Sequence, residues 1–225
     1  MKIGINDVLK QVRLFFILYL ILLCACLIIK ALFTRHEIYF AVNAHFYAFA
    51  DWIAPYITDL GNGWTIVSLS AILLLFSYRA GFLMATTYAL TSLSAQVVKY
   101  IFDLPRPTLL YKDQLSHIHL VKGIYMLQFN SFPSGHTVTA FSAAIVILYL
   151  IKNKNWWVAL FIYAVAVGYS RMYLSQHFFE DVVAGSALGV FFTIWWLSFI
   201  ESREFIHRPS WSRGLLNTLK TKARS

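Results

Sequence analysis

The chain has 225 residues, of which 59% are hydrophobic and only 13% are charged. Soluble domains carry about twice that share of charged residues, and their surface helices keep a polar face. The composition therefore disfavours a soluble helical protein. The net charge is +9, but the basic residues lie mainly in short polar segments and near the C-terminus. That distribution favours contact with anionic lipid and disfavours a nucleic-acid partner.

Long apolar runs recur along the chain and predict membrane-spanning helices, because a helix needs about 20 apolar residues to cross a bilayer core. We therefore expect an all-α membrane protein, a bundle of six transmembrane helices. The expected spans are 13–33, 64–78, 82–101, 133–151, 156–173 and 179–200. We expect residues 1–225 to form one domain, with a membrane core over 13–201 and a basic cytoplasmic tail over 202–225.

The first apolar run has a basic flank, as a signal peptide does. Bulky residues follow it, among them Lys30 and Phe33, where a cleavage site would have small ones. We therefore expect the run to be retained as an anchor. Its two cysteines, Cys24 and Cys26, are two residues apart and point to different helix faces, so we expect them to pack and not to pair.

Two of the connecting segments have a recognisable character. Segment 34–63 is polar and rich in aromatic residues, which predicts a helix lying at the membrane interface. Segment 79–81 is short and polar, and we expect it to form a tight turn between the second and third spans.

Six spans place both termini on one side of the membrane. If that side is the cytoplasm, twelve of the 19 Lys and Arg residues lie inside and seven outside, as the positive-inside rule requires. The seven outside residues are Lys30, Arg35, Lys99, Arg106, Lys112, Lys122 and Arg171; the twelve inside are Lys2, Lys10, Arg13, Arg79, Lys152, Lys154, Arg203, Arg208, Arg213, Lys220, Lys222 and Arg224. We therefore expect a multi-pass protein of the cell (inner) membrane with cytoplasmic termini. The loop after span three and the loop between spans five and six then share the extracytoplasmic face.

A first polar cluster reads KYIFDLPRP, from Lys99 to Pro107. Lys99 lies near the end of span three and Arg106 just beyond it. Ionisable residues at membrane depth are costly and usually functional. The alternative is that both side chains only extend to the lipid headgroups.

A second cluster reads SFPSGH and comes directly before span four. Ser134 is expected to cap that helix, and Gly135 lets the backbone approach a ligand closely. The free N–H groups and the dipole of the helix start favour an anion. His136 lies in the same first turn. The alternative is an ordinary helix start with an interfacial histidine.

A third cluster reads SRMYLSQHFFED, from Ser170 to Asp181. His177 and Asp181 are four residues apart, so on a helix they share one face, and a carboxylate can fix the tautomer of an imidazole. The second ring nitrogen is then free to act as a nucleophile. Arg171 supplies a planar fork suited to phosphate oxygens. The alternatives are a surface ion pair or metal ligands, and we expect neighbouring Glu180 to be structural.

The three clusters together resemble the type 2 phosphatidic acid phosphatases, which share their site with the vanadium haloperoxidases. The family pattern is Lys, six residues, Arg-Pro; then Pro-Ser-Gly-His; then Ser-Arg, five residues, His, three residues, Asp. The matching residues here are Lys99, Arg106, Pro107, Pro133, Ser134, Gly135, His136, Ser170, Arg171, His177 and Asp181. The pattern is met at every position and in the same order, and it spans residues 99 to 181.

The resemblance implies a role for each of these residues. His177 attacks phosphorus and becomes a phosphohistidine, Asp181 orients it, and His136 protonates the leaving oxygen and then activates water. The phosphate oxygens are held by Lys99, Arg106, Ser134, Gly135 and Arg171. Neither a metal nor a cofactor is implied, because the cations do the work of a metal. Two further cations of the long loop, Lys112 and Lys122, are candidate headgroup contacts; the alternative is a solvated loop.

These observations predict an integral membrane phosphatase that hydrolyses a lipid phosphate or diphosphate, with undecaprenyl diphosphate as the best single substrate. Phosphatidylglycerophosphate, phosphatidic acid and a lipid A phosphate stay open as alternatives, as does transfer of the phosphate to another lipid. Haloperoxidase chemistry suits a soluble protein, and a transporter needs no aligned nucleophile. The expected partners are the lipid substrate and the bilayer, with no obligate protein partner.

Overall fold

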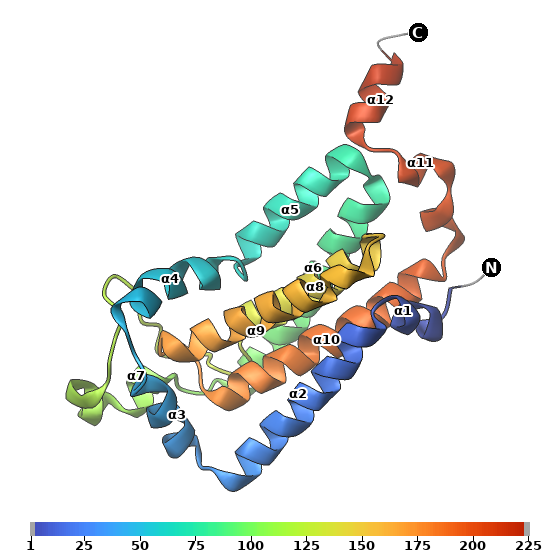
Figure 1. The fold of residues 1–225 in the computed structure, drawn as a ribbon. Coiled ribbons are helices and arrows are strands. Elements are labelled where there is room, and N and C mark those ends of the chain that lie inside the picture. The colour runs from blue at the N-terminus through green and yellow to red at the C-terminus, as the bar shows by residue number, and fades with distance from the viewer. Residues whose placement is uncertain (1–2, 223–225) are drawn as a thin grey trace.

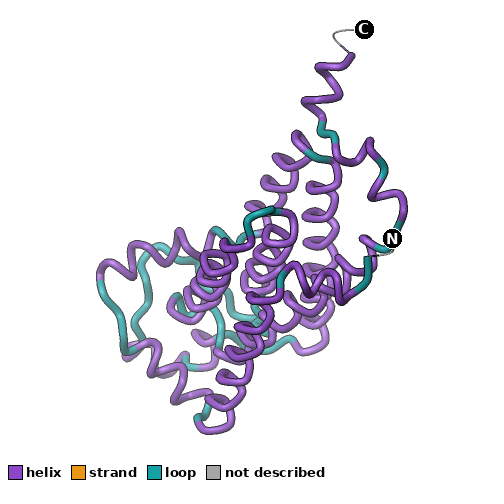
Figure 2. The backbone as a smooth tube through the Cα atoms, turned by 45° about the vertical axis from the view of Figure 1, so that its right-hand side comes forward, coloured by secondary structure: helices purple, strands orange, loops and turns teal. Residues whose placement is uncertain are grey.

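The computed structural model describes residues 3–222, and over this range it is built of helices and connecting loops without a strand (Figure 2). Residues 1–2 and 223–225 lie outside the described residues, so Lys2, Arg224 and the end of the expected basic tail are not placed.

Figure 1 shows the helices in chain order. They are α1 (Ile5–Gln11), α2 (Arg13–Leu32), α3 (Arg35–Asn43), α4 (Ala48–Asp59), α5 (Gly63–Phe76), α6 (Tyr78–Phe102), α7 (Pro107–Leu110), η1 (Lys112–His117), α8 (Gly135–Leu150), η2 (Lys154–Trp156), α9 (Trp157–Tyr173), α10 (Phe179–Glu201), η3 (Glu204–His207), α11 (Pro209–Ser212) and α12 (Leu215–Lys222). A long helix occupies each of the six segments in which a span is expected.

Length and apolar composition qualify two of the described helices as membrane spans, α2 and α10. A third is added if α4 and α5, which meet at an angle of 51°, count as one bent span. Helix α8 is apolar but shorter. Apolar helices of this kind indicate a membrane location, while the arrangement of six spans stays a prediction.

Two expectations about connecting segments are wrong in detail. Segment 34–63 holds two helices, α3 and α4, and not one, and α4 runs almost directly into α5. Residues 79–81 form no turn, because α6 already begins at Tyr78. The turn is confined to Ser77, whose hydroxyl accepts a hydrogen bond from the Ala80 N–H at 3.2 Å and caps the new helix.

Helix α8 is the buried centre of the bundle, and α6, α9 and α10 pack around it. Two glycines of α10 let it lie against α8 at close range. A Cβ atom on Gly185 would lie 2.7 Å from the Ser134 carbonyl oxygen, and one on Gly189 would lie 2.6 Å from that of Val138. Because of this contact, the start of α10 sits directly beside the start of α8.

The two ends of the bundle differ in character. Both termini and the turn between α8 and α9 lie at one end, whereas α3, α7 and the long loop after α6 lie at the other (Figure 1). At the end that holds the termini, Arg79 donates a hydrogen bond to the fully buried Glu201 at 2.7 Å and joins α6 to α10. Cys24 and Cys26 are unpaired, as the sequence predicts.

Candidate active site

The three sequence clusters meet at the end of the bundle opposite the termini. The first lies at the end of α6 and in the loop beyond it, the second at the start of α8, and the third between α9 and α10. Backbone hydrogen bonds join them: the Ser134 N–H donates to the Asp181 carbonyl at 2.9 Å, and the Ser131 N–H donates to that of Leu104 at 2.9 Å.

His177 is buried in the short connection that follows α9, with 2% of its surface exposed. The prediction that His177 shares a helix face with Asp181 is wrong, because α10 begins only at Phe179. Its Nε2 lies 3.4 Å from Nη1 of Arg106. A guanidinium only donates hydrogen bonds, so we assign the lone pair to Nε2 and the ring proton to Nδ1.

Asp181, in the first turn of α10, is the carboxylate nearest to this ring. Its Oδ2 lies 3.5 Å from Nδ1 of His177, which is longer than a hydrogen bond. The same oxygen accepts hydrogen bonds from the Ser131 hydroxyl at 2.5 Å and from the Phe178 N–H at 2.9 Å. The carboxylate is thus held in place by the start of its own helix and by the segment before α8.

The connection that carries His177 is itself held in an unusual conformation. Ser175 has a φ of 53°, in the left-handed region that non-glycine residues rarely adopt. Its hydroxyl lies 3.0 Å from that of Tyr39 and 3.4 Å from Nδ2 of Asn43, both on α3. Helix α3 therefore supports the backbone two residues before His177.

Two arginines lie buried beside the imidazole, with 5% and 7% of their surfaces exposed. Arg106 donates from Nε to the Phe129 carbonyl at 2.9 Å and from Nη1 to the Gln176 carbonyl at 3.0 Å. Arg171 donates to the Thr58 hydroxyl of α4 at 2.7 Å. Burial lowers the pKa of Arg106 to about 10, although the Asp181 charge opposes the shift, so Arg106 stays charged at neutral pH.

Lys99 and the start of α8 complete the group of residues expected in the site. Lys99 donates from Nζ to the Asn130 carbonyl at 2.5 Å. Ser134 is the N-cap residue of α8 by position, but its hydroxyl accepts from Thr137 at 2.9 Å and from no backbone N–H, so the expected side-chain cap is absent. A Cβ on Gly135 would meet nothing within 4 Å, which leaves open space at this helix start beside His136.

Burial and the positive charges around it set the protonation state of His177. Burial lowers its pKa well below the usual 6.5, and the charges of Arg106, Arg171 and Lys99, together with His136, lower it further. At neutral pH the imidazole is therefore neutral, and its Nε2 lone pair is available. The described residues contain no group of three or more His, Cys, Asp or Glu placed to hold a metal ion.

The loop cations and Glu180 make no direct contact with this group that the structure shows. Lys112 and Lys122 are exposed, and neither side chain forms an ion pair or a hydrogen bond within residues 3–222. Glu180 pairs with Arg35 of α3 and lies 3.5 Å from Lys30 of α2, which fits the structural role expected for it.

Sequence reasoning missed several neighbours of the arginines. Gln176 had a usable signal, since it directly precedes His177 in an otherwise apolar and aromatic stretch. Thr58 gave no signal, because it lies more than 100 residues away in the chain. The carbonyl groups of 128–130 could not be found from side-chain identity at all.

Apolar helices and buried arginines around a neutral histidine are features of a membrane phosphatase. Comparison with known families agrees: the model described as the PAP2 superfamily matches residues 80–205, more than half of the chain. The chain therefore belongs to the PAP2 superfamily, in its membrane lipid phosphatase family.

Individual relatives extend over most of the chain. The undecaprenyl-diphosphatase of Sulfolobus acidocaldarius is 27% identical over 171 residues, which are 73% of this chain and 75% of that protein. The crystal structure of Aquifex aeolicus LpxE is similar with a TM-score of 0.64 at 28% identity, over 72% of this chain and 93% of that one. That of the first transmembrane PAP2 type phosphatidylglycerolphosphate phosphatase from Bacillus subtilis has a TM-score of 0.63 at 25% identity, over 87% and 98%.

The low pKa of His177 predicts a pH-dependent stability. Below pH 6.5 the unfolded chain binds a proton at this histidine that the folded chain does not, so stability falls as the pH decreases. The loss approaches about 1.4 kcal/mol per pH unit. Melting temperatures in detergent between pH 7.5 and pH 5 should therefore fall more steeply for the wild type than for His177→Gln. Parallel curves for the two proteins would contradict the assigned protonation state.

Proposed function

We propose that this chain hydrolyses the phosphate or diphosphate group of a membrane lipid through a phosphohistidine formed on His177. The observation that carries the proposal is the contact between Nε2 of a buried neutral imidazole and the guanidinium of Arg106. A phosphoryl group placed there meets a nucleophilic lone pair and a fixed donor at once.

The proposed reaction has two steps. In the first, Nε2 of His177 attacks phosphorus, the bond to the leaving oxygen breaks, and His136 gives that oxygen a proton. In the second, His136 takes a proton from water, which attacks phosphorus and releases phosphate from the histidine. Asp181 stabilises the charge that the imidazole acquires, since its carboxylate faces the Nδ1 proton.

The phosphate-binding role is proposed for Lys99, Arg106, Arg171 and the helix start at Ser134 and Gly135. Arg106 and Arg171 are fixed by burial and by hydrogen bonds, so they need little reorganisation when charge moves to the phosphoryl oxygens. The open space at Gly135 gives an anion access to the N-terminal end of α8.

The nucleophile is tested by three substitutions. We expect His177→Ala to abolish turnover and His136→Ala nearly to do so, because losing one such group costs several orders of magnitude in rate. Asp181→Asn should be milder, since the imidazole remains and only its orientation and charge stabilisation suffer. Phosphate release by purified protein in detergent measures all three. Retention of more than about a tenth of wild-type activity by His177→Ala would refute the mechanism.

We also propose that no divalent metal takes part, because fixed cations already surround the phosphoryl position. Activity should then survive EDTA, and vanadate should inhibit, since it adopts the trigonal-bipyramidal geometry of phosphorus during transfer. The measurement is phosphate release with and without EDTA and added magnesium. Activity that disappears in EDTA and returns with magnesium would count against the proposal.

The site is proposed to face the extracytoplasmic side of the cell membrane, with both termini in the cytoplasm. The basic residues support this orientation, and the site lies at the end of the bundle opposite the termini (Figure 1).

Orientation is tested by labelling exposed positions at the two ends. After Cys24 and Cys26 are replaced by serine, a cysteine at Gln114 should react with a membrane-impermeant thiol reagent in intact spheroplasts, and one at Asn153 should not. Both positions are exposed, so accessibility differs only by side. The reverse pattern of labelling would overturn the orientation.

The proposed substrate is a long-chain lipid diphosphate, with undecaprenyl diphosphate as the best candidate. Support comes from the name of the Sulfolobus relative and from the exposed Lys112 and Lys122, which offer a second positive position that only a diphosphate would use. The phosphatidylglycerolphosphate phosphatase from Bacillus subtilis keeps phosphatidylglycerophosphate as an alternative, and other relatives, which are lipid A phosphatases, keep a lipid A phosphate as another. Apolar burial of the chain should contribute about 0.8 kcal/mol per methylene until its groove is filled.

Substrate class is tested by comparing a diphosphate and a monophosphate that carry the same chain. We expect the wild type to prefer the diphosphate. The double variant Lys112→Ala, Lys122→Ala should lose that preference, because its contact with the second phosphate is gone. Catalytic efficiency should also fall for short chains. A monophosphate preference of about tenfold or more would exclude the diphosphate assignment. Equal rates on short water-soluble esters would exclude a lipid substrate.

A further inference from the structure

Gln176 is buried, with 3% of its surface exposed, and directly precedes His177. It lies outside the residues that the family pattern specifies. Its side chain nevertheless contacts both buried arginines and the long loop after α6. The amide oxygen faces the arginines, and the amide nitrogen faces the loop.

The amide oxygen lies where the two arginines converge. Oε1 accepts from Nη1 of Arg106 at 3.2 Å and lies 3.5 Å from Nη2 of Arg171. No carboxylate forms an ion pair with either arginine in the described part of the chain. A neutral oxygen thus holds Arg106 by a hydrogen bond and lies close to Arg171, so the two guanidiniums converge, as bidentate phosphate recognition needs.

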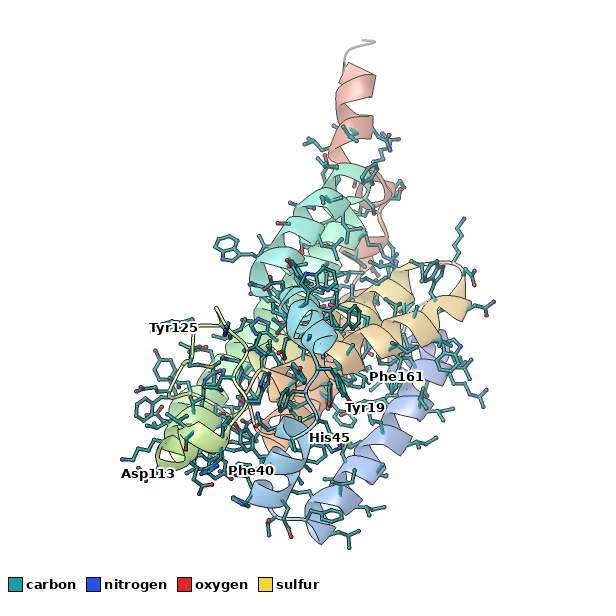
Figure 3. All side chains as sticks on the ribbon, turned by 60° about the vertical axis from the view of Figure 1, so that its left-hand side comes forward. Tyr19, Phe40, His45, Asp113, Tyr125 and Phe161 are labelled. Atoms are coloured by element: carbon teal, nitrogen blue, oxygen red, sulfur yellow. The ribbon has the colours of Figure 1, made fainter. Side chains whose placement is uncertain are left out.

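The amide nitrogen is bound to the loop. Nε2 donates to the Tyr125 carbonyl at 3.1 Å and lies 3.2 Å from the Met126 sulfur. A few residues further along, the carbonyls of Phe129 and Asn130 accept from Arg106 and Lys99. The loop that carries Tyr125, labelled in Figure 3, is therefore a wall of the phosphate site, and Gln176 attaches it to the connection before α10.

We propose that Gln176 is a positioning residue that aligns Arg106 and Arg171 for the phosphoryl group and fastens residues 125–130 beside them. This inference rests on the proposed function. Its neutral amide is essential, because an oxygen with a full negative charge would pair with both arginines and compete with the phosphate. A glutamine that only attached the loop would lower the melting temperature when replaced by glutamate, without a specific loss of phosphate binding.

Two substitutions separate these roles. Gln176→Glu keeps the shape and the acceptor oxygen but adds a charge and removes the donor to the loop. Gln176→Met has a similar length and removes both polar ends. Gln114→Glu, the same chemical change at an exposed position, is the matched control. For each protein, the inhibition constant of inorganic phosphate, kcat, KM and the melting temperature are measured in detergent.

We expect Gln176→Glu to raise the inhibition constant of phosphate by about tenfold or more, with no fall in melting temperature, because the new carboxylate pairs with the arginines. Gln176→Met should raise it less and reduce kcat. Gln114→Glu should match the wild type. If Gln176→Glu folds and binds phosphate as the wild type does, or if it is the milder of the two variants, the inference is wrong.

Folding failures are also decisive. If Gln176→Glu does not fold, Gln176→Met decides. A folded Gln176→Met with wild-type kcat and wild-type phosphate inhibition overturns the inference, and a folded Gln176→Met with about tenfold lower kcat supports it. If neither variant folds, the residue is structural and the inference fails. A wild type that releases no phosphate from any lipid, or that phosphate does not inhibit, would instead refute the proposed function.

Discussion

Positive charge buried without a carboxylate ion pair in the described part of the chain is the constraint on which this structure depends. Arg106 and Arg171 lie almost fully out of solvent, where an unpaired charge is costly. Backbone carbonyls of the loop after α6, the Thr58 hydroxyl and the Gln176 amide accept hydrogen bonds from them without neutralising them, and Nε of Arg171 has no hydrogen-bond partner within residues 3–222. The charge thus remains available to an anion, and together with burial it keeps His177 neutral, so the same arginines serve both anion binding and the nucleophile.

The helices are arranged so that this group can form. Close packing at Gly185 and Gly189 sets the start of α10 against the start of α8, which places Asp181 beside Ser134 and Ser131. Helix α4 contributes Thr58, and α3 supports the backbone at Ser175. The apolar α2 is largely exposed in the isolated chain, as expected of a helix that faces lipid. The buried polar contacts of the site therefore gather at one end of the bundle, and buried Glu201 with its partner Arg79 lies at the other.

Much of the fold and of the site could be predicted from the sequence, because long apolar runs predict helices and the residues that carry the chemistry fall in three compact clusters. The helix boundary at His177 was misjudged, since spacing alone cannot show that the connection after α9 continues through Ser175 in a left-handed conformation. The division of segment 34–63 into α3 and α4 was missed, because aromatic composition predicts a position at the membrane interface but does not show where a helix ends. The carbonyls that hold Lys99 and Arg106 are independent of side-chain identity, so only the folded loop reveals them.

Passage of phosphate through a covalent bond to His177 is tested most directly by trapping the phosphorylated protein. Wild-type protein is mixed with a saturating lipid phosphate substrate, quenched in base under denaturing conditions within the first turnover, digested and analysed by mass spectrometry. We expect a phosphorylated peptide with the modification on His177, absent when substrate is omitted. Rapid turnover with phosphate on another residue, or with no phosphorylated peptide at any quench time, would contradict transfer through His177.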